Sequence, residues 1–137
     1  MIRAVFDTNI LYSAIRKPEG LPARAVDLVV SGQVLPCVSD ALIDEYRGVL
    51  LRPELDLHAD RRRQVLDIFS TLSLHVTPTK TLKISDHEDD NRFYECAAEA
   101  LADYIVTGNT KHFPRPYKTT QIITARQLVE LFHGKQP

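Results

Sequence analysis

The chain has 137 residues, a formal net charge of −1 and 44% hydrophobic residues. This length suits one domain whose core needs no disulfide or metal to hold it together. The near-zero charge excludes a global basic field for nucleic acid, so any such binding must come from local patches or from metal ions. The longest apolar stretches fall short of the ~20 residues of a membrane span, and residues 1–4 show no signal-peptide pattern. We therefore expect a cytoplasmic protein without membrane contact, with Cys37 and Cys96 as reduced core residues.

Strand-like and helix-like segments alternate along the chain. In chain order, the pattern predicts strand 2–6, helices 8–15 and 22–31, strand 34–38, helix 39–51, helix 59–74, strand 74–76, helix 88–102, strand 104–106, strand 122–123 and helix 125–133. Ser39 is expected to cap the third of these helices and Pro53 to end it. A polar connection is expected at 77–85. Such alternation predicts a parallel sheet with helices on both faces.

Asp7 closes the first apolar run and is followed at once by Thr8, Asn9 and a predicted helix. A carboxylate at the carboxyl end of a buried strand stands where open α/β sheets place their chemistry. The alternative is an ordinary capping or loop residue. Further acids stand at positions where a domain without an active site would have apolar residues. These acids favour a functional site.

Two further acids lie at such positions. In the helix after Ser39, Glu45 borders the apolar face, whereas Asp44 points away from it into solvent.

In the helix predicted at 88–102, Asp90 opens the apolar stripe. That stripe is expected to consist of Phe93, Ala97, Ala100 and Leu101, and the solvent face of Arg92, Glu95 and Glu99. Favourable interaction with the helix dipole suffices to explain Asp86 and Asp89. It does not explain Asp90, which we take as a candidate site residue together with Glu45.

The predicted strand 104–106 ends in Thr107, Gly108 and Asn109, at the same carboxyl edge as Asp7. Asp103 begins that strand at the opposite edge and is interpreted as structural. Three carboxylates and an amide converging on one edge suit hard divalent cations such as Mg²⁺ or Mn²⁺. Such ions activate water and neutralise charge on a phosphodiester, so the cluster favours metal-dependent phosphoryl chemistry.

Competing chemistries lack their motifs. The sequence contains no phosphate-binding loop of the form G-x-x-x-x-G-K-[ST], no G-x-S-x-G, and no histidines at zinc spacing. A phosphotransferase of the haloacid-dehalogenase type would need a second Asp two residues after Asp7, where this chain has Asn9.

Four blocks of residues resemble the PIN domain family. The blocks are 2–11, containing Asp7, Thr8 and Asn9; 39–50, containing Glu45 and Tyr46; 86–97, containing Asp90; and 102–109, containing Thr107, Gly108 and Asn109. They cover nearly the whole chain in the family's order. The likeness is greatest to the VapC-type toxins of bacterial toxin–antitoxin pairs.

The resemblance implies a single PIN-like nuclease domain over residues 1–137, with a three-layer α/β/α fold around a central, mainly parallel twisted sheet. It implies a Mg²⁺- or Mn²⁺-dependent ribonuclease in which Asp7, Glu45 and Asp90 hold the metal. Asn109 stands where members of the subgroup often have Asp, so one negative charge is missing. His112 stands where some relatives carry another acid. One firmly bound metal is expected, and a second is left open.

In that mechanism the acids act with four polar neighbours. Asp7 and Asp90 bind the metal, and Glu45 either ligates it or orients its water. Thr107 and Asn109 position the phosphate or a ligating water, and Thr8 and Asn9 orient Asp7. Basic residues that flank this edge are candidates for phosphate contacts: Arg16, Lys17, Lys111, Arg115 and Lys118. The run Arg61–Arg63 is interpreted as a solvated helix face.

The partners follow from the resemblance alone: an RNA substrate, a small antitoxin protein and a second copy of the chain in a homodimer. Two rival functions stay open. One is a housekeeping RNA-processing nuclease on the same fold. The other is a binding module that has lost activity together with its fourth acid.

Overall fold

A computed structural model describes residues 1–52 and 59–133, and Pro53 lies outside this part. Its central sheet has the strand order β3-β2-β1-β4-β5, and all the neighbouring strands pair in parallel. The strands are β1 (Ile2–Phe6), β2 (Val34–Val38), β3 (Leu74–His75), β4 (Tyr104–Val106) and β5 (Gln121–Ile123). In register, Ile2 pairs with Val34 and Ala4 with Tyr104. The predicted parallel sheet is therefore confirmed.

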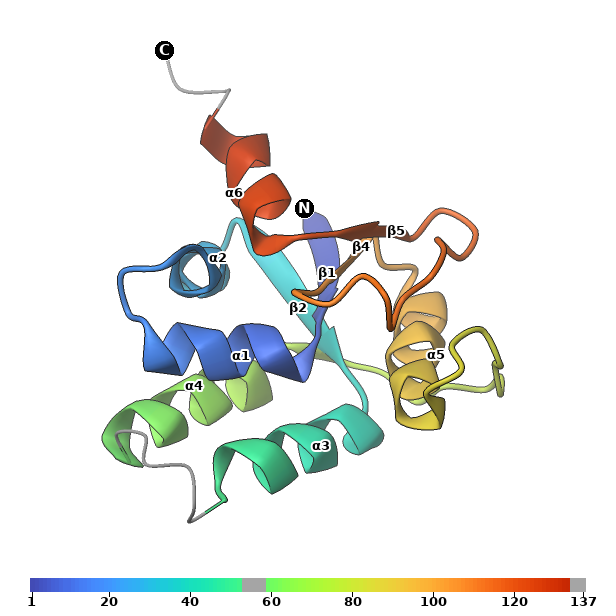
Figure 1. The fold of residues 1–137 in the computed structure, drawn as a ribbon, viewed down its shortest axis with the longest axis horizontal. Helices are drawn as coiled ribbons and strands as arrows, with labels where there is room; N and C mark the ends of the chain where they lie inside the picture. Colours follow the sequence, from blue (N-terminus) through green and yellow to red (C-terminus); the bar gives the residue numbers. More distant parts are fainter. Residues whose placement is uncertain (53–58, 134–137) are drawn as a thin grey trace.

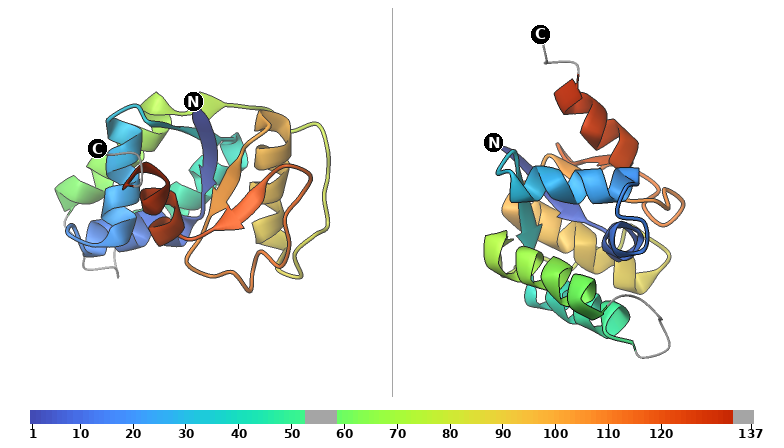
Figure 2. Two further views of the ribbon diagram at one scale, coloured as in Figure 1. Left: turned by 90° about the horizontal axis from the view of Figure 1, so that it is seen from above. Right: turned by 90° about the vertical axis from the view of Figure 1, so that its left-hand side faces the viewer.

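Helices cover both faces of this sheet. They are α1 (Thr8–Arg16), α2 (Leu21–Val30), α3 (Asp40–Leu50), α4 (Ala59–Leu72), α5 (Asn91–Ala100) and α6 (Ala125–His133), with a 3₁₀ turn η1 (Glu88–Asp90) before α5. Helix α5 packs on β1, β2 and β4 from one side, while α1, α2 and α4 lie on the other (Figure 1). Figure 2 shows that α3 lies beside α4. The predicted three-layer α/β/α fold is confirmed.

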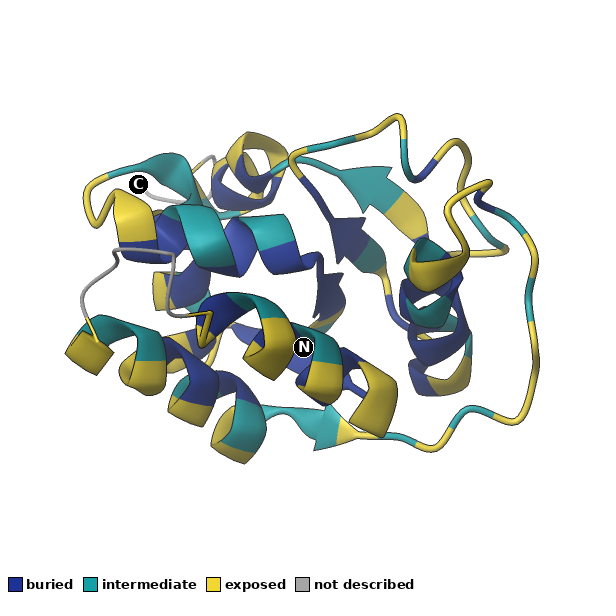
Figure 3. Ribbon diagram, turned by 60° about the horizontal axis from the view of Figure 1, so that its bottom comes forward, coloured by how far each residue is buried: buried dark blue, intermediate teal, exposed yellow. Residues whose placement is uncertain are grey.

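The core lies where these layers meet. Ala4, Val5 and Phe6 of β1 have no exposed surface because a central strand of a parallel sheet is covered on both faces. The Phe6 ring packs edge-on against Phe69 of α4, with the ring centroids 5.3 Å apart. Figure 3 shows buried residues on the inward sides of the helices and exposed residues outside. No helix in the described part of the chain is both long enough and apolar enough to cross a membrane.

Both cysteines lie inside this core. Cys37 and Cys96 are free and buried, as predicted. Burial raises the pKa of the Cys37 thiol to about 11, since a thiolate would lose its solvation there. Both thiols therefore behave as small apolar side chains.

The helix predicted at 88–102 differs at both ends. It starts as the 3₁₀ turn η1, and α5 ends at Ala100. Leu101 adopts a left-handed conformation with φ 52° and is 76% exposed, so its predicted place on the buried stripe is wrong. Leu101 takes this conformation because the chain must reverse there to enter β4.

Glu95 was predicted on the solvent face and is instead buried, with 8% of its surface exposed. The connection that precedes η1 runs over this side of α5. Glu95 accepts a hydrogen bond from the Leu82 amide at 3.0 Å and pairs with Arg92 at 2.9 Å. The helical pattern alone could not reveal this covering segment.

The start of α4 holds two neighbouring helices at their carboxyl ends. Arg61 donates to the Ala14 carbonyl near the end of α1 at 3.0 Å, and Arg62 donates to the Leu50 carbonyl of α3 at 3.4 Å. Both arginines are half-buried, so the prediction of a solvated face holds only for Arg63. Carbonyls in the last turn of a helix lack intrahelical donors, which explains these contacts. Ser39 caps α3 as predicted, accepting from the Leu42 amide at 3.4 Å.

The strand order places the site. From β1 the chain proceeds through β2 to β3 in one direction, and it then crosses back to β4 on the opposite side of β1. Between β1 and β4 the sheet therefore has a switch point, and ligands of open α/β sheets bind outside the carboxyl ends of the strands at such a point. Asp7 and Thr107 directly follow these two strands.

Candidate active site

Asp7 is held at the end of β1 by the neighbouring strand. Its amide donates to the Val106 carbonyl at 2.9 Å, and its Oδ2 accepts from the Thr107 hydroxyl at 2.7 Å. Although Asp7 occupies the N-cap position of α1, its side chain makes no capping hydrogen bond. The carboxylate is 8% exposed. The ordinary alternative of a capping aspartate is thus not what the structure shows.

Glu45 reaches the same edge from α3. It is half-buried, and its Oε2 accepts from the Thr8 hydroxyl at 2.9 Å. We expected Thr8 to orient Asp7, but its hydroxyl donates its hydrogen bond to Glu45 instead. Asp44, one residue earlier, is exposed as predicted. The one-residue difference on a helix therefore separates a site candidate from a solvated charge.

Asp90 comes from the turn η1 on the other side of the sheet. It is half-buried, and its Oδ2 lies 3.1 Å from His112 Nδ1. Burial raises the pKa of Asp90, and the neighbouring His112 and His87 act in the opposite direction. The charge of Glu45 raises the Asp90 pKa further, so the two acids are close enough to interact electrostatically.

Asp7 interacts electrostatically with both of these acids. Burial raises its pKa, the Thr107 hydrogen bond opposes that rise, and the charges of Asp90 and Glu45 add to it. Among residues 1–52 and 59–133, neither Asp7 nor Glu45 forms an ion pair with Lys or Arg within 4.0 Å. Acids gathered without basic partners are a donor set that fits a hard divalent cation.

The loop after β4 completes this edge. The Gly108 amide donates to Asn9 Oδ1 at 3.2 Å, and the Asn109 amide donates to the Thr107 hydroxyl at 3.0 Å. A Cβ at Gly108 would lie 3.6 Å from Asn9 Oδ1, an ordinary van der Waals contact, so Asn9 and Gly108 are close neighbours. Asn9 therefore ties the start of α1 to the loop, while Thr107 links Asp7 to Asn109.

A cavity of about 380 Å³ opens at this edge. It is lined by Asp7, Thr8, Asn9, Tyr12, Val49, Arg52, Asn109 and His112. Arg52 and Tyr12 were not identified from the sequence, because neither stands in a motif. Of the basic candidates, Arg16 and Lys17 line a neighbouring cavity with Tyr12. Lys111, Arg115 and Lys118 are exposed on the β4–β5 connection.

Sequence reasoning also missed a cluster around Asp90. In the described part of the chain, the metal-ligating atoms of His87, Asp90 and His112 form the one group of three or more lying within 4.8 Å of one another. Asp7 and Glu45 stand outside that compact group. His87 and His112 lie far apart in the sequence and have no zinc-like spacing, so only the fold brings them together.

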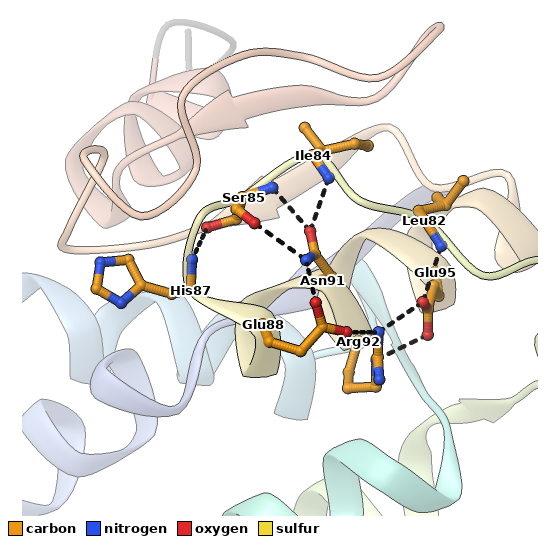
Figure 4. Close-up of polar contacts among 8 residues, drawn as sticks. All are labelled: Leu82, Ile84, Ser85, His87, Glu88, Asn91, Arg92 and Glu95. Carbon is orange, nitrogen blue, oxygen red and sulfur yellow. Dashed lines mark hydrogen bonds and ion pairs between the residues drawn. The ribbon is translucent and has the colours of Figure 1, made fainter.

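Asn91 was also missed by sequence reasoning, and it shapes the turn that carries Asp90. Its side chain has no exposed surface. The Oδ1 atom accepts from the amides of Ile84 and Ser85 at 2.9 and 2.7 Å, and Nδ2 donates to the Ser85 carbonyl at 3.1 Å (Figure 4). The sequence signal that could have identified Asn91 is an Asn at the start of an apolar helix, because a buried amide group needs hydrogen-bond partners.

This arrangement defines a class of protein: an α/β/α domain with a parallel sheet of order 3-2-1-4-5 and a cluster of acids at its switch point. The chain matches the family model of the PIN domain over residues 3–111. It therefore belongs to the PIN domain family.

Two known proteins are similar to it. An uncharacterized protein of Methanocaldococcus jannaschii is 31% identical over 111 residues, which cover 79% of this chain and 71% of that protein. In the crystal structure of VapBC2 from Rickettsia felis bound to a DNA fragment from their promoter, one chain matches with a TM-score of 0.61 at 17% identity. That match covers 90% of this chain and 98% of the other, and it shows a shared fold.

Proposed function

We propose that residues 1–137 form a single nuclease domain, a metal-dependent endoribonuclease that acts as the toxin of a toxin–antitoxin pair. The observation that carries the nuclease proposal is the gathering of Asp7, Glu45 and Asp90, without Lys or Arg partners in the described residues, at the switch point of the sheet. Membership of the PIN domain family supports it. The fold shared with a VapBC2 structure supports the toxin assignment.

The acids fit a divalent cation, Mg²⁺ or Mn²⁺. Asp7 and Asp90 would hold the ion, and Glu45 would ligate it or orient a water beside it. When bound, the cation supplies an activated water and neutralises charge on the phosphodiester. The donor set supports this assignment, because burial and the charges of Asp90 and Glu45 raise the pKa of Asp7, and a nearby positive charge would offset this.

The neighbouring side chains keep these acids in place. Thr107 donates to Asp7 and favours its charged form, and the Thr8 hydroxyl donates a hydrogen bond to Glu45. Asn9 fixes the loop at Gly108 and so positions Asn109 at the cavity. Asn109 would contact the phosphate or a ligating water through its amide. Arg52, which lines the same cavity, would supply positive charge for the RNA backbone.

One observation favours a second candidate, a binding module without activity. Asn109 lines the cavity where related toxins often carry an acid, so the site has one charge fewer. A housekeeping RNA-processing nuclease would share the active site and differ in its cellular effect. The proposed toxin is expected to act as a homodimer and to be silenced by an antitoxin protein.

The test is cleavage of a mixed-sequence single-stranded RNA by the purified protein in Mn²⁺, in Mg²⁺ and in EDTA. Asp7→Asn and Glu45→Gln are compared with Asp44→Asn, which changes an exposed acid on the same helix as Glu45. Metal-dependent cutting that is lost in the first two variants and kept in the third supports the nuclease. Absence of cutting by a folded wild-type protein in either metal favours the binding module.

The toxin assignment needs a cellular readout. Overproduction of the wild type is expected to arrest growth, and overproduction of Asp7→Asn is not. Growth that continues while the purified protein still cuts RNA would point to the housekeeping nuclease.

A further inference from the structure

The turn η1 and the β4–β5 connection bring two imidazoles to one carboxylate. His112 Nδ1 lies 3.1 Å from Asp90 Oδ2, and the rings of His87 and His112 lie 4.0 Å apart between centroids, tilted by 35°. One ligand atom from each of the three residues falls within 4.8 Å of the others. In a tetrahedral site with bonds of ~2.1 Å the ligand atoms are separated by roughly 3.4 Å, so side-chain rotations that draw the three atoms together would bring them onto one ion.

Both halves of this group are fixed on helix α5. Asn91, at the start of α5, binds the backbone of Ile84 and Ser85 and so holds the turn that carries His87 and Asp90. Ser85 adds a hydrogen bond from the His87 amide to its hydroxyl at 3.1 Å. These contacts fix the backbone of the turn before any ligand is present.

The segment with His112 is anchored on the same helix from the other side. Phe113, the next residue, is buried and packs its ring on Phe93 and Tyr94 of α5. The Tyr94 hydroxyl donates to the Arg115 carbonyl at 2.6 Å. His112 is therefore held by packing on its carboxyl-terminal side, and its own amide donates to the Asn109 carbonyl at 3.2 Å.

The chemistry of this group differs from that of the acid cluster. Two imidazoles and one carboxylate suit first-row transition metals, whereas carboxylates alone suit Mg²⁺. Neutral imidazoles add ligands without adding negative charge, and the carboxylate of Asp90 has a second oxygen that remains available to the acid cluster.

We propose that His87, Asp90 and His112 form a binding site that takes a first-row transition metal such as Co²⁺ or Zn²⁺ in preference to Mg²⁺. The binding itself does not require the chain to be a nuclease. Asp90 belongs both to this site and to the acid cluster. In this one respect the inference rests on the proposed function: the histidine site supplies a second metal position next to the acid cluster, where Asn109 contributes no charge.

The test is a titration of the full chain with Co²⁺ near pH 7, followed by visible absorption, with calorimetry for Zn²⁺ and Mg²⁺. His87→Ala and His112→Ala are each expected to weaken Co²⁺ and Zn²⁺ binding by at least about tenfold and to weaken Mg²⁺ binding much less. His133→Ala, which removes an exposed histidine at the end of α6, is the matched control and keeps wild-type affinity. Circular dichroism verifies that each variant is folded.

Two results would overturn the site. One is wild-type Co²⁺ affinity in both His87→Ala and His112→Ala. The other is the absence of zinc-dependent shifts in the ring resonances of these two histidines by NMR. Asp7→Asn separates this proposal from the nuclease, because it is expected to lose cleavage while still binding Co²⁺ through the histidines.

Discussion

Two regions of the molecule present the candidate acids in different ways. Asp7 and Thr107 extend directly from the central strands β1 and β4, and backbone pairing within the sheet fixes both. Asp90 instead lies on a 3₁₀ turn whose shape depends on one buried amide side chain, that of Asn91. Half of the site is therefore built into the sheet, and the other half depends on a few side-chain contacts. Single substitutions should therefore disturb the two halves to different degrees.

The largest effect on stability is expected from Asn91→Ala. It leaves the buried amides of Ile84 and Ser85 without an acceptor, and each such loss costs about 1–3 kcal/mol. We expect a fall of about 3 kcal/mol or more in the free energy of unfolding, measured by urea denaturation. Asn91→Asp keeps the acceptor oxygen but sets a second oxygen against the Ser85 carbonyl and Glu88, to which Nδ2 donates, so it should also lose stability. Asp89→Ala, an exposed change in the same turn, should stay within about 0.5 kcal/mol. Equal stability of Asn91→Ala and Asp89→Ala would refute this account of the turn.

Thr107→Val tests the half that the sheet provides. It removes the donor to Asp7 and the acceptor for the Asn109 amide without shortening the side chain. We expect RNA cleavage to fall by about 10–100-fold while the fold is kept. Since the lost hydrogen bond favours charged Asp7, its pKa should rise, and the acid limb of the pH–rate profile should move to higher pH. Thr107→Ser should restore both; unchanged cleavage in Thr107→Val would contradict the role of the hydroxyl.

Asp7→Asn is expected to stabilise the protein while abolishing cleavage. Burial, reinforced by Asp90 and Glu45, raises the pKa of Asp7 in the folded protein above its ordinary value near 3.8. The protonated form therefore stabilises the fold fully below about pH 3.8, and this contribution is lost as the pH rises through the folded pKa. At pH 7 without metal, the variant should melt roughly 2–5 °C above the wild type.

The sign of this effect has two checks by differential scanning calorimetry. The difference in Tm between Asp7→Asn and the wild type should shrink as the pH is lowered toward 3.8. Added Mg²⁺ should also reduce it, by stabilising only the wild type. A variant that melts below the wild type under metal-free conditions would assign Asp7 a structural role instead.

The smallest effect is expected from Tyr94→Phe, which removes one hydrogen bond from α5 to the segment that carries His112. The expected loss is about 1 kcal/mol, because Phe keeps the packing on Phe113. Faster hydrogen exchange should be confined to residues near 112–117. Tyr117→Phe, in the same segment, is the control. Slower exchange or no change in Tyr94→Phe would show that packing alone anchors this segment.

Much of the fold was predictable because its signals are local. Apolar runs ended by turn residues located β1, β2 and β4, and Ser39 marked the start of α3. The alternation of strands and helices predicted the parallel sheet. Asp7 and Glu45 were identifiable as candidates for the same reason, since each breaks a local pattern at a strand end or on a helix face.

Local sequence patterns thus specify the layers and the acids that the site is proposed to use. The distant segments that cover them follow from the assembled fold: the connection that buries Glu95 and the loop that sets His112 against Asp90. It also gave Asn91 its partners. Periodicity reports which side of an element is apolar, and it carries no information on which remote segment packs there. That choice depends on contacts between residues far apart in the chain, and these exist only once the sheet has assembled.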